Sequence, residues 1–112
     1  MISKGNLTNM LKQAKQIQER LETTQKELES LEIEGQAGGG MVVARVNGKQ
    51  ELLSIKIEPE ILQEDVELVE DLIVAAVNQA NQRAAEESQK RMNEVSGGML
   101  GALGNINIPG IK

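Results

Sequence analysis

A lysine that follows a glycine raises the question of phosphate binding, because glycine-rich loops that end in Gly-Lys hold nucleotide phosphates. Gly48-Lys49 ends the stretch GQAGGGMVVARVNGK, which covers residues 35–49. A P-loop also needs a glycine five positions before this pair and a serine or threonine directly after it. Position 43 is valine and position 50 is glutamine, so the sequence does not match a P-loop.

The composition excludes most other catalytic and metal-binding chemistry. The 112 residues include no Cys, His, Trp, Tyr or Phe, so the usual nucleophiles, general bases and zinc ligands are missing. The acidic residues between positions 64 and 71 have no nucleophile or ligand spacing around them and are typical of a helix start, where they complement the helix dipole. Bases of single-stranded nucleic acid would find no aromatic ring to stack on. We therefore expect no enzyme, no cofactor and no metal ion.

Basic residues gather near the two ends of the chain, although the net charge is −5. Residues 1–20 contain four basic residues and one acidic residue, whereas residues 21–82 contain four basic and thirteen acidic residues. Residues 83–112 contain four basic and three acidic residues. Two interpretations are open: the basic residues keep a helix surface soluble, or they bind an anion such as the DNA backbone, which needs only positioned Lys and Arg.

The first basic segment belongs to a long helix predicted over residues 6–32, with Asn6 as its N-cap. Apolar residues fill a and d positions over nearly four heptads: Leu7, Ala14, Leu21 and Leu28, with Met10, Ile17, Thr24 and Leu31 in the offset series. A helix of about 26 residues is roughly 39 Å long. This length exceeds what a small domain needs, so part of the helix is expected to project.

An antiparallel sheet is predicted next. Residues 42–46 and 52–57 alternate between apolar and polar types around Asn47-Gly48, which indicates a β-hairpin in which Gly48 supplies a positive φ. A loop of two or four residues would give one apolar face made of Val42, Ala44, Val46, Leu53, Ile55 and Ile57. A preceding strand near residues 33–37 and a turn at Gly38–Gly40 complete three strands.

A second long helix is predicted over residues 66–95. Pro59 ends the last strand and suits a first helical turn, and Asp65 is a suitable N-cap. Ser96-Gly97-Gly98 is expected to end the helix, so that residues 1–96 form one domain and residues 97–112 a flexible glycine-rich tail. The result is an α+β fold of the order α-β-β-β-α. If both helices pack on the apolar face, they run antiparallel, with the end of the first beside the start of the second.

The whole chain offers a thin core of Leu, Ile, Val, Met and Ala, so oligomerisation is expected to add stability. It contains no apolar run long enough to span a membrane, and its first residues lack the apolar core of a secretory signal. These features predict a cytoplasmic protein.

Four segments, taken together, resemble the YbaB/EbfC family of bacterial nucleoid-associated proteins. They are residues 9–20 (NMLKQA leading to IQER), residues 40–48 (GMV leading to VNG), residues 55–62 (IKIEPEIL) and residues 70–80 (EDLIVAAVNQA). They occur in the family's order and spacing and cover nearly the whole chain up to about Met99. Each segment alone is weak evidence, but their combination is specific.

The resemblance implies an intertwined, tweezer-like homodimer that binds double-stranded DNA with low sequence specificity in the nucleoid. Projecting helices are the proposed DNA contact in this family. Carried to this sequence, the DNA-binding residues would be Lys4, Lys12, Lys15, Arg20, Lys90 and Arg91. The alternative is a protein-interaction scaffold whose helices or apolar tail dock onto a replication or recombination protein, which deletion of residues 97–112 would distinguish.

Overall fold

The computed structural model describes the backbone of residues 4–103 and the side chains of residues 4–97. The elements in chain order are α1 (Lys4–Ser30), β1 (Ile33–Ala37), β2 (Val42–Val46), β3 (Leu52–Ile57), a short 3-10 helix η1 (Pro59–Gln63) and α2 (Val66–Leu103). The predicted order α-β-β-β-α is therefore confirmed. Within the described residues, neither long helix is apolar enough to cross a membrane.

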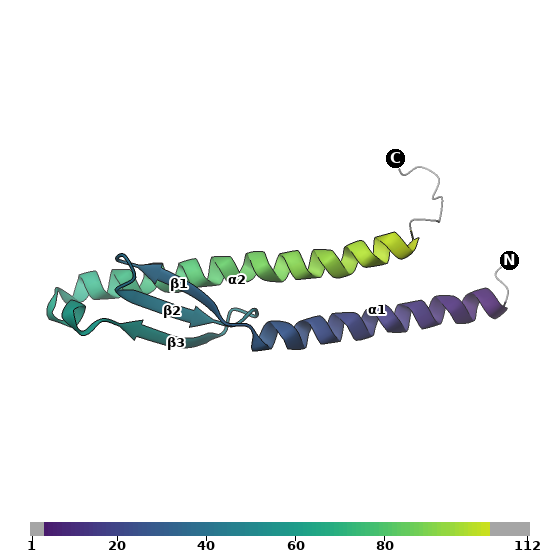
Figure 1. The fold of residues 1–112 in the computed structure, drawn as a ribbon, viewed down its shortest axis with the longest axis horizontal. Coiled ribbons are helices and arrows are strands. Elements are labelled where there is room, and N and C mark those ends of the chain that lie inside the picture. The colour runs from purple at the N-terminus through teal and green to yellow at the C-terminus, as the bar shows by residue number, and fades with distance from the viewer. Residues whose placement is uncertain (1–3, 104–112) are drawn as a thin grey trace, which may run out of the picture.

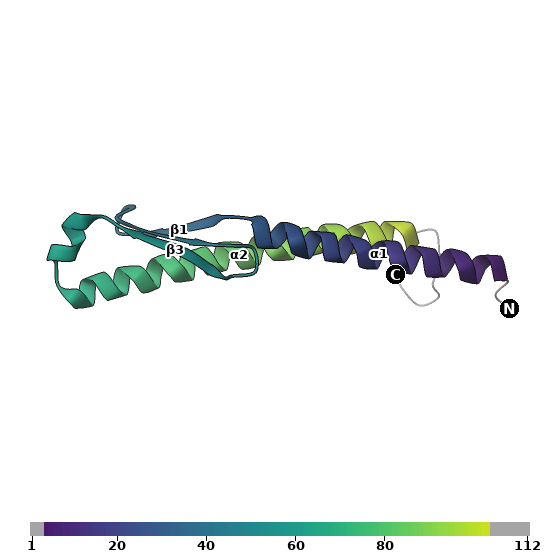
Figure 2. The same cartoon turned by 90° about the horizontal axis from the view of Figure 1, so that it is seen from below.

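The molecule is long and thin, measuring 73 × 29 × 16 Å. The sheet lies at one end, beside the first half of α2, and α1 runs antiparallel to the second half of α2 toward the other end (Figures 1 and 2). The α1 helix begins at Lys4, so the expected N-cap Asn6 lies inside the helix. The start of α1 and the end of α2 point the same way, which gives the projecting end that the helix length predicted.

The sheet is antiparallel with strand order β1-β2-β3. The β1–β2 turn contains Gly38, Gly39 and Gly40, whose φ angles of +64°, +68° and +94° are accessible to glycine at little cost. The glycine turn predicted at this place is therefore confirmed.

The β2–β3 hairpin differs from its prediction at the turn. Asn47 N–H donates to the Glu51 carbonyl at 3.0 Å, which closes a loop of three residues rather than two or four. Val46 consequently faces Leu52, and a register shift between Arg45 and Val46 pairs Ala44 with Ile55 and Val42 with Ile57, which places these four residues on one face as predicted. Leu53 falls at the shift, and Leu52 takes the place opposite Val46 that the apolar face predicted for an odd-numbered residue.

The core lies between the sheet and α2. Val42, Ala44 and Val46 of β2 are fully buried against three alanines of α2, Ala76, Ala80 and Ala84. A Cβ at Gly35 in β1 would collide with the backbone of Ala76 and Ala80. Small residues on both elements therefore allow the helix to lie directly on the strands.

The expectation that both helices cover the sheet was wrong. Within the described residues, α2 is the helix that packs on β1 and β2, and α1 lies beyond the end of the sheet and reaches it only with its last turn (Figure 2). Gly48 N–H donates to the Leu28 carbonyl at 2.7 Å, which holds the end of α1 at the hairpin turn. The end of α1 therefore meets the middle of α2, not its start.

The α2 helix also passes through the residues that were expected to end it. It begins as predicted after Asp65, whose carboxylate accepts a hydrogen bond from Glu67 N–H at 3.4 Å, but it continues through Ser96, Gly97 and Gly98 to Leu103. A glycine lowers helix stability by only about 1 kcal/mol, and Met99, Leu100, Ala102 and Leu103 are good helix formers. Residues 104–112 of the expected tail lie outside the described part of the chain.

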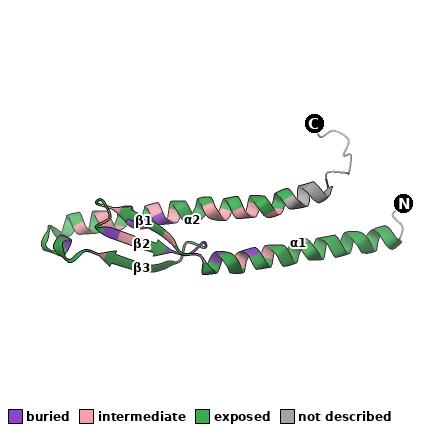
Figure 3. Cartoon of the chain, in the orientation of Figure 1, coloured by how far each residue is buried: buried purple, intermediate pink, exposed green. Residues whose placement is uncertain are grey.

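Burial decreases along the heptad pattern of α1 from its end to its start (Figure 3). Thr24 and Leu28 are buried, whereas Leu7, Met10 and Leu11 are 50%, 54% and 63% exposed. Among the described residues, the heptad positions are therefore buried against α2 in the second half of α1, and the apolar residues at its start are exposed.

Candidate nucleic-acid interface

The first half of α1 presents a stripe of lysines. Lys4, Lys12 and Lys15 are all exposed, and no acidic residue lies between positions 4 and 15. With about 3.6 residues per turn, these lysines lie roughly 115–165° around the helix from the heptad positions that face α2. They therefore point away from the rest of the chain, where a large anion can reach them.

The basic stripe ends after Lys15. Glu19 and Glu22 follow on the same side of the helix, as the helical period of about 3.6 residues requires. Only the projecting part of α1 therefore has a purely basic outer surface.

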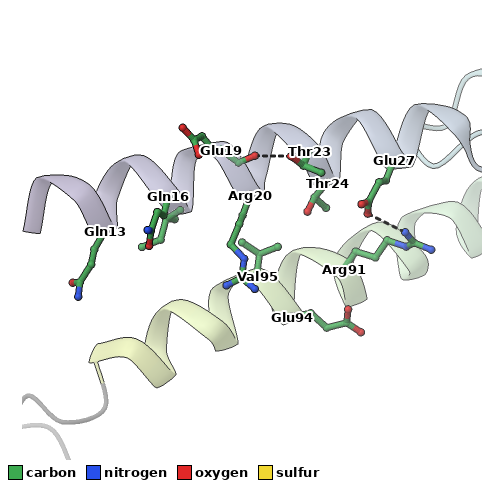
Figure 4. A pocket seen from close by; sticks show the side chains of 11 residues that line it. Gln13, Gln16, Glu19, Arg20, Thr23, Thr24, Glu27, Arg91, Glu94 and Val95 are labelled. Atoms are coloured by element: carbon green, nitrogen blue, oxygen red, sulfur yellow. Dashed lines mark hydrogen bonds and ion pairs between the residues drawn. The ribbon is translucent and has the colours of Figure 1, made fainter. Parts of the chain in front are cut away.

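Arg20 occupies a different position, at the open cleft between the helices. The cleft has a volume of about 690 Å³ and is lined by Gln13, Ile17 and Thr24 of α1 and by Arg91 and Val95 of α2, among others. Figure 4 shows the Arg20 side chain reaching from α1 toward Val95. Arg20 is exposed, but it faces the cleft side and is separate from the lysine stripe.

The two basic residues predicted on α2 have opposite orientations. Lys90 is exposed, whereas Arg91 is half-buried on the side that faces α1. The Arg91 guanidinium lies 3.5 Å from a Glu27 carboxylate oxygen and 3.0 Å from one of Glu87 (Figure 4 draws the Glu27 pair). Arg91 therefore already joins the two helices, while Lys90 is available to a ligand.

Two further basic residues near the base of the helices also have partners inside the chain. Arg83 donates to the Glu34 carbonyl of β1 at 2.9 Å. Lys49 donates to a Glu29 carboxylate oxygen at 2.7 Å, and this hydrogen bond, together with the lysine charge, lowers the pKa of the Glu29 carboxyl. Lys49 thus stabilises the contact between α1 and the hairpin and is not part of a phosphate-binding loop.

Acidic residues dominate the opposite end of the molecule. The described residues contain no cluster of three or more acidic side chains that could hold a metal ion. The fold does not bring the predicted site residues together at one point. Lys4, Lys12 and Lys15 share one face of α1, Arg20 lies at the cleft, and Lys90 lies on the neighbouring helix. The arrangement is suited to an extended anion rather than to a small molecule.

Curated relatives align with nearly the full chain. A nucleoid-associated protein of Clostridium perfringens is 48% identical over 96 residues, covering 85% of this chain and 86% of the relative. The nucleoid-associated protein Cphamn1_1179 of Chlorobium phaeobacteroides is also 48% identical, over 92% of this chain and 95% of the relative. A nucleoid-associated protein of Alkaliphilus metalliredigens is 47% identical over 95% of this chain.

A solved structure of similar fold and a match to a protein family add to these relatives. The crystal structure of the uncharacterized protein HP0035 from Helicobacter pylori has a similar fold, with a TM-score of 0.62 at 19% identity over 89% of this chain and 99% of that one. The sequence model of the YbaB/EbfC DNA-binding family matches residues 4–99 of this chain. The family name denotes DNA-binding proteins, and the relatives' names denote association with the nucleoid and not an enzyme activity. The chain therefore belongs to the YbaB/EbfC DNA-binding family.

Proposed function

We propose that this protein is a homodimer of the nucleoid that binds double-stranded DNA with low sequence specificity through the basic tips of its projecting helices. The main support is the exposed stripe of Lys4, Lys12 and Lys15 on the outer face of α1. Relatives at 47–48% identity that are named nucleoid-associated proteins support the cellular location.

Low sequence specificity follows from the chemistry of the stripe. Lysine ammonium groups are point charges that bind phosphate oxygens, and such contacts position a protein without reading the bases. We assign the phosphate contacts to Lys4, Lys12, Lys15 and Lys90, with Arg20 at the margin of the surface. Arg91 contributes indirectly, because its ion pairs with Glu27 and Glu87 hold α1 against α2.

Homodimerisation is supported by the apolar surface that a single chain leaves uncovered. Leu52 and Leu53 of β3 are about half exposed, and Ile55 is also exposed. The β3 strand is an edge of the sheet, and an exposed apolar edge strand favours association with another chain. A second copy that covers β3 would bury this surface and place two basic tips on one particle.

Two tips would strengthen DNA binding without any new kind of contact. Once one tip is bound, the second tip searches a small volume, which raises its effective concentration at the DNA. This effect suits a protein whose net charge of −5 makes each separate contact weak.

A gel-shift titration with random-sequence duplex DNA over a range of salt concentrations tests the proposed function. We expect binding at low salt, with an affinity that falls steeply as salt rises, because bound counterions are released from DNA. In the double variant Lys12→Glu/Lys15→Glu, two phosphate contacts are lost at each bound tip, so the slope of log affinity against log salt should become shallower by about two units per tip, or about four if both tips of the dimer bind.

The matched control is Lys26→Glu/Lys56→Glu, which changes the net charge equally at exposed positions away from the tip. It should retain most of the affinity if the position of the lysines, and not only the total charge, determines binding. Absence of binding at low salt, or binding that does not depend on salt, would refute the proposed function. Equal losses in both double variants would place the contact elsewhere.

A further inference from the structure

The face of α1 that carries the lysine stripe also carries uncovered leucines. Leu7 and Leu11 are 50% and 63% exposed, and Lys4 and Lys15 lie beside them, all within roughly 80° of the helix circumference. We call these four residues the tip face. A surface that combines leucines with lysines is complementary to one that combines apolar and acidic side chains.

Such a surface exists at the other end of the same chain. Residues 58–71 contain seven acidic residues and no basic residue, and all seven are exposed: Glu58, Glu60, Glu64, Asp65, Glu67, Glu70 and Asp71. Leu62 and Val66 lie among them and are more than 60% exposed. We call residues 58–71, which include η1 and the start of α2, the acidic end.

The tip face and the acidic end cannot meet within one chain. They lie at opposite ends of a particle 73 Å long (Figure 1). The ion pairs of the described residues involve Arg45, Lys49 and Arg91, and none of them includes a charged side chain of the tip face or the acidic end. The two complementary surfaces can therefore contact each other only between two molecules.

We propose that the tip face of one molecule docks on the acidic end of a second copy, with Leu7 and Leu11 against Leu62 and Val66. The lysines would lie against the surrounding carboxylates. The contact joins two different surfaces, so it is not closed by a two-fold axis and can add further copies in a chain.

This head-to-tail contact differs from the homodimer contact proposed for β3, which would be made by the same surface of both copies. It is small compared with stable interfaces, which bury about 800 Å² on each partner. We therefore expect it to form at high protein concentration and low salt, where exposed charge pairs are least screened. The same lysines would contact DNA in the proposed function, so duplex DNA should dissociate the chains of copies.

Sedimentation velocity at low salt, without DNA, tests the docking directly. The wild-type average mass should rise with concentration beyond that of a fixed small oligomer. The variants Lys4→Glu/Lys15→Glu and Glu60→Lys/Glu64→Lys/Glu67→Lys/Glu70→Lys should each lose this rise, because each makes the two ends alike in charge. The second variant needs four changes because the acidic end carries seven carboxylates.

Mixing the two charge-reversed variants provides the decisive measurement. The acidic tip of the first variant would then face the basic end of the second, and the basic tip of the second would face the acidic end of the first. We expect the mixture to recover the concentration-dependent rise in mass. A constant wild-type mass at low salt, or a mixture that behaves like its separate components, would overturn the proposal.

A second variant separates docking from DNA binding. Leu7→Ser/Leu11→Ser keeps every charge and should weaken head-to-tail association by about tenfold or more, equivalent to roughly 1.4 kcal/mol, while circular dichroism shows the fold intact. Its DNA affinity should stay within about twofold of wild type. This DNA measurement rests on the proposed function, whereas the sedimentation results do not, so failure of either idea can be recognised separately. Unchanged association in this variant would exclude the apolar part of the contact.

Discussion

At the scale of single residues, Gly48 determines how closely α1 approaches the hairpin. Its N–H donates to the Leu28 carbonyl at 2.7 Å, and a Cβ at this position would lie 2.8 Å from both that oxygen and the Leu28 Cδ2 atom. The positive φ of the turn belongs to Gln50, at +65°. Glycine is therefore required at position 48 by lack of space and not by the backbone angle that the Asn-Gly pair suggested.

The Gly48→Val variant tests this explanation. The added side chain must displace Leu28 or the end of α1, and overpacking of this kind typically lowers the free energy of unfolding by about 1–3 kcal/mol. Chemical denaturation would measure the loss. Gly97→Ala is the control, because no atom lies within 4 Å of its Cβ position, and it should be neutral or stabilising by up to about 1 kcal/mol. A stable Gly48→Val protein without DNA binding would contradict our placement of the DNA contact.

The Glu29 carboxylate gives a residue-level prediction about pH. The hydrogen bond and charge of Lys49 lower the pKa of Glu29, so the pair stabilises the folded protein above the ordinary glutamate pKa and loses this effect as the pH falls through the lower, folded value. Lys49→Gln should return the Glu29 pKa toward its ordinary value of about 4.3, as measured by NMR titration. Lys26→Gln should shift it less, because Lys26 contributes only a smaller charge effect. Identical Glu29 titrations in wild type and Lys49→Gln would show that the pair is not formed in solution.

At the scale of elements, two adjacent residues of α2 have different roles: one holds the helices together, and the other is open to a ligand. Arg91 pairs with Glu27 of α1 and Glu87 of its own helix, whereas the neighbouring Lys90 is exposed. The two positions carry the same charge and differ in direction by the roughly 100° of one helical residue.

We expect Arg91→Gln to loosen α1 from α2 and Lys90→Gln to weaken DNA binding. Since these ion pairs are partly exposed, the loss of stability from Arg91→Gln should be about 1 kcal/mol or less, with faster hydrogen exchange in the second half of α1. Lys90→Gln should leave exchange unchanged and reduce DNA affinity at low salt. The reverse pattern would show that Arg91 is the phosphate contact and that Lys90 is not.

At the scale of the whole molecule, the proposed homodimer depends on β3. The double variant Leu52→Lys/Ile55→Lys places two charges on the apolar surface that a second copy would cover, because Leu52 and Ile55 pair with Val46 and Ala44 on one face of the sheet. A dimer should therefore dissociate into monomers at micromolar concentration. Sedimentation equilibrium would measure this change. Ser54→Lys is the control, because Ser54 pairs with the exposed Arg45, which lies on the opposite face of β2 from Ala44 and Val46, and it should leave the mass unchanged. A double variant with the mass of the wild type would place the dimer contact on another surface.

Local patterns predicted most elements but not how they meet. The three strands, the glycine turn and the Asp65 cap depend on neighbouring residues, and each was confirmed. The three-residue loop and the shift at Leu53 were missed, because an Asn-Gly pair is compatible with several loop lengths. The continuation of α2 past Gly98 was missed, because the small penalty of glycine depends on the helix formers that follow.

The sequence by itself determined the chemistry of this protein. A chain without Cys, His or aromatic residues, with basic residues in its first helix, excludes most catalysis and allows phosphate contacts wherever its lysines are exposed. Only the tertiary structure decided which basic residues are free. Packing of the small residues of α2 on β1 and β2 fills the sheet face and leaves α1 to project, so Lys4, Lys12 and Lys15 face solvent while Arg91 faces Glu27. Charge is a property of each residue, but its availability depends on distances between residues far apart in the chain.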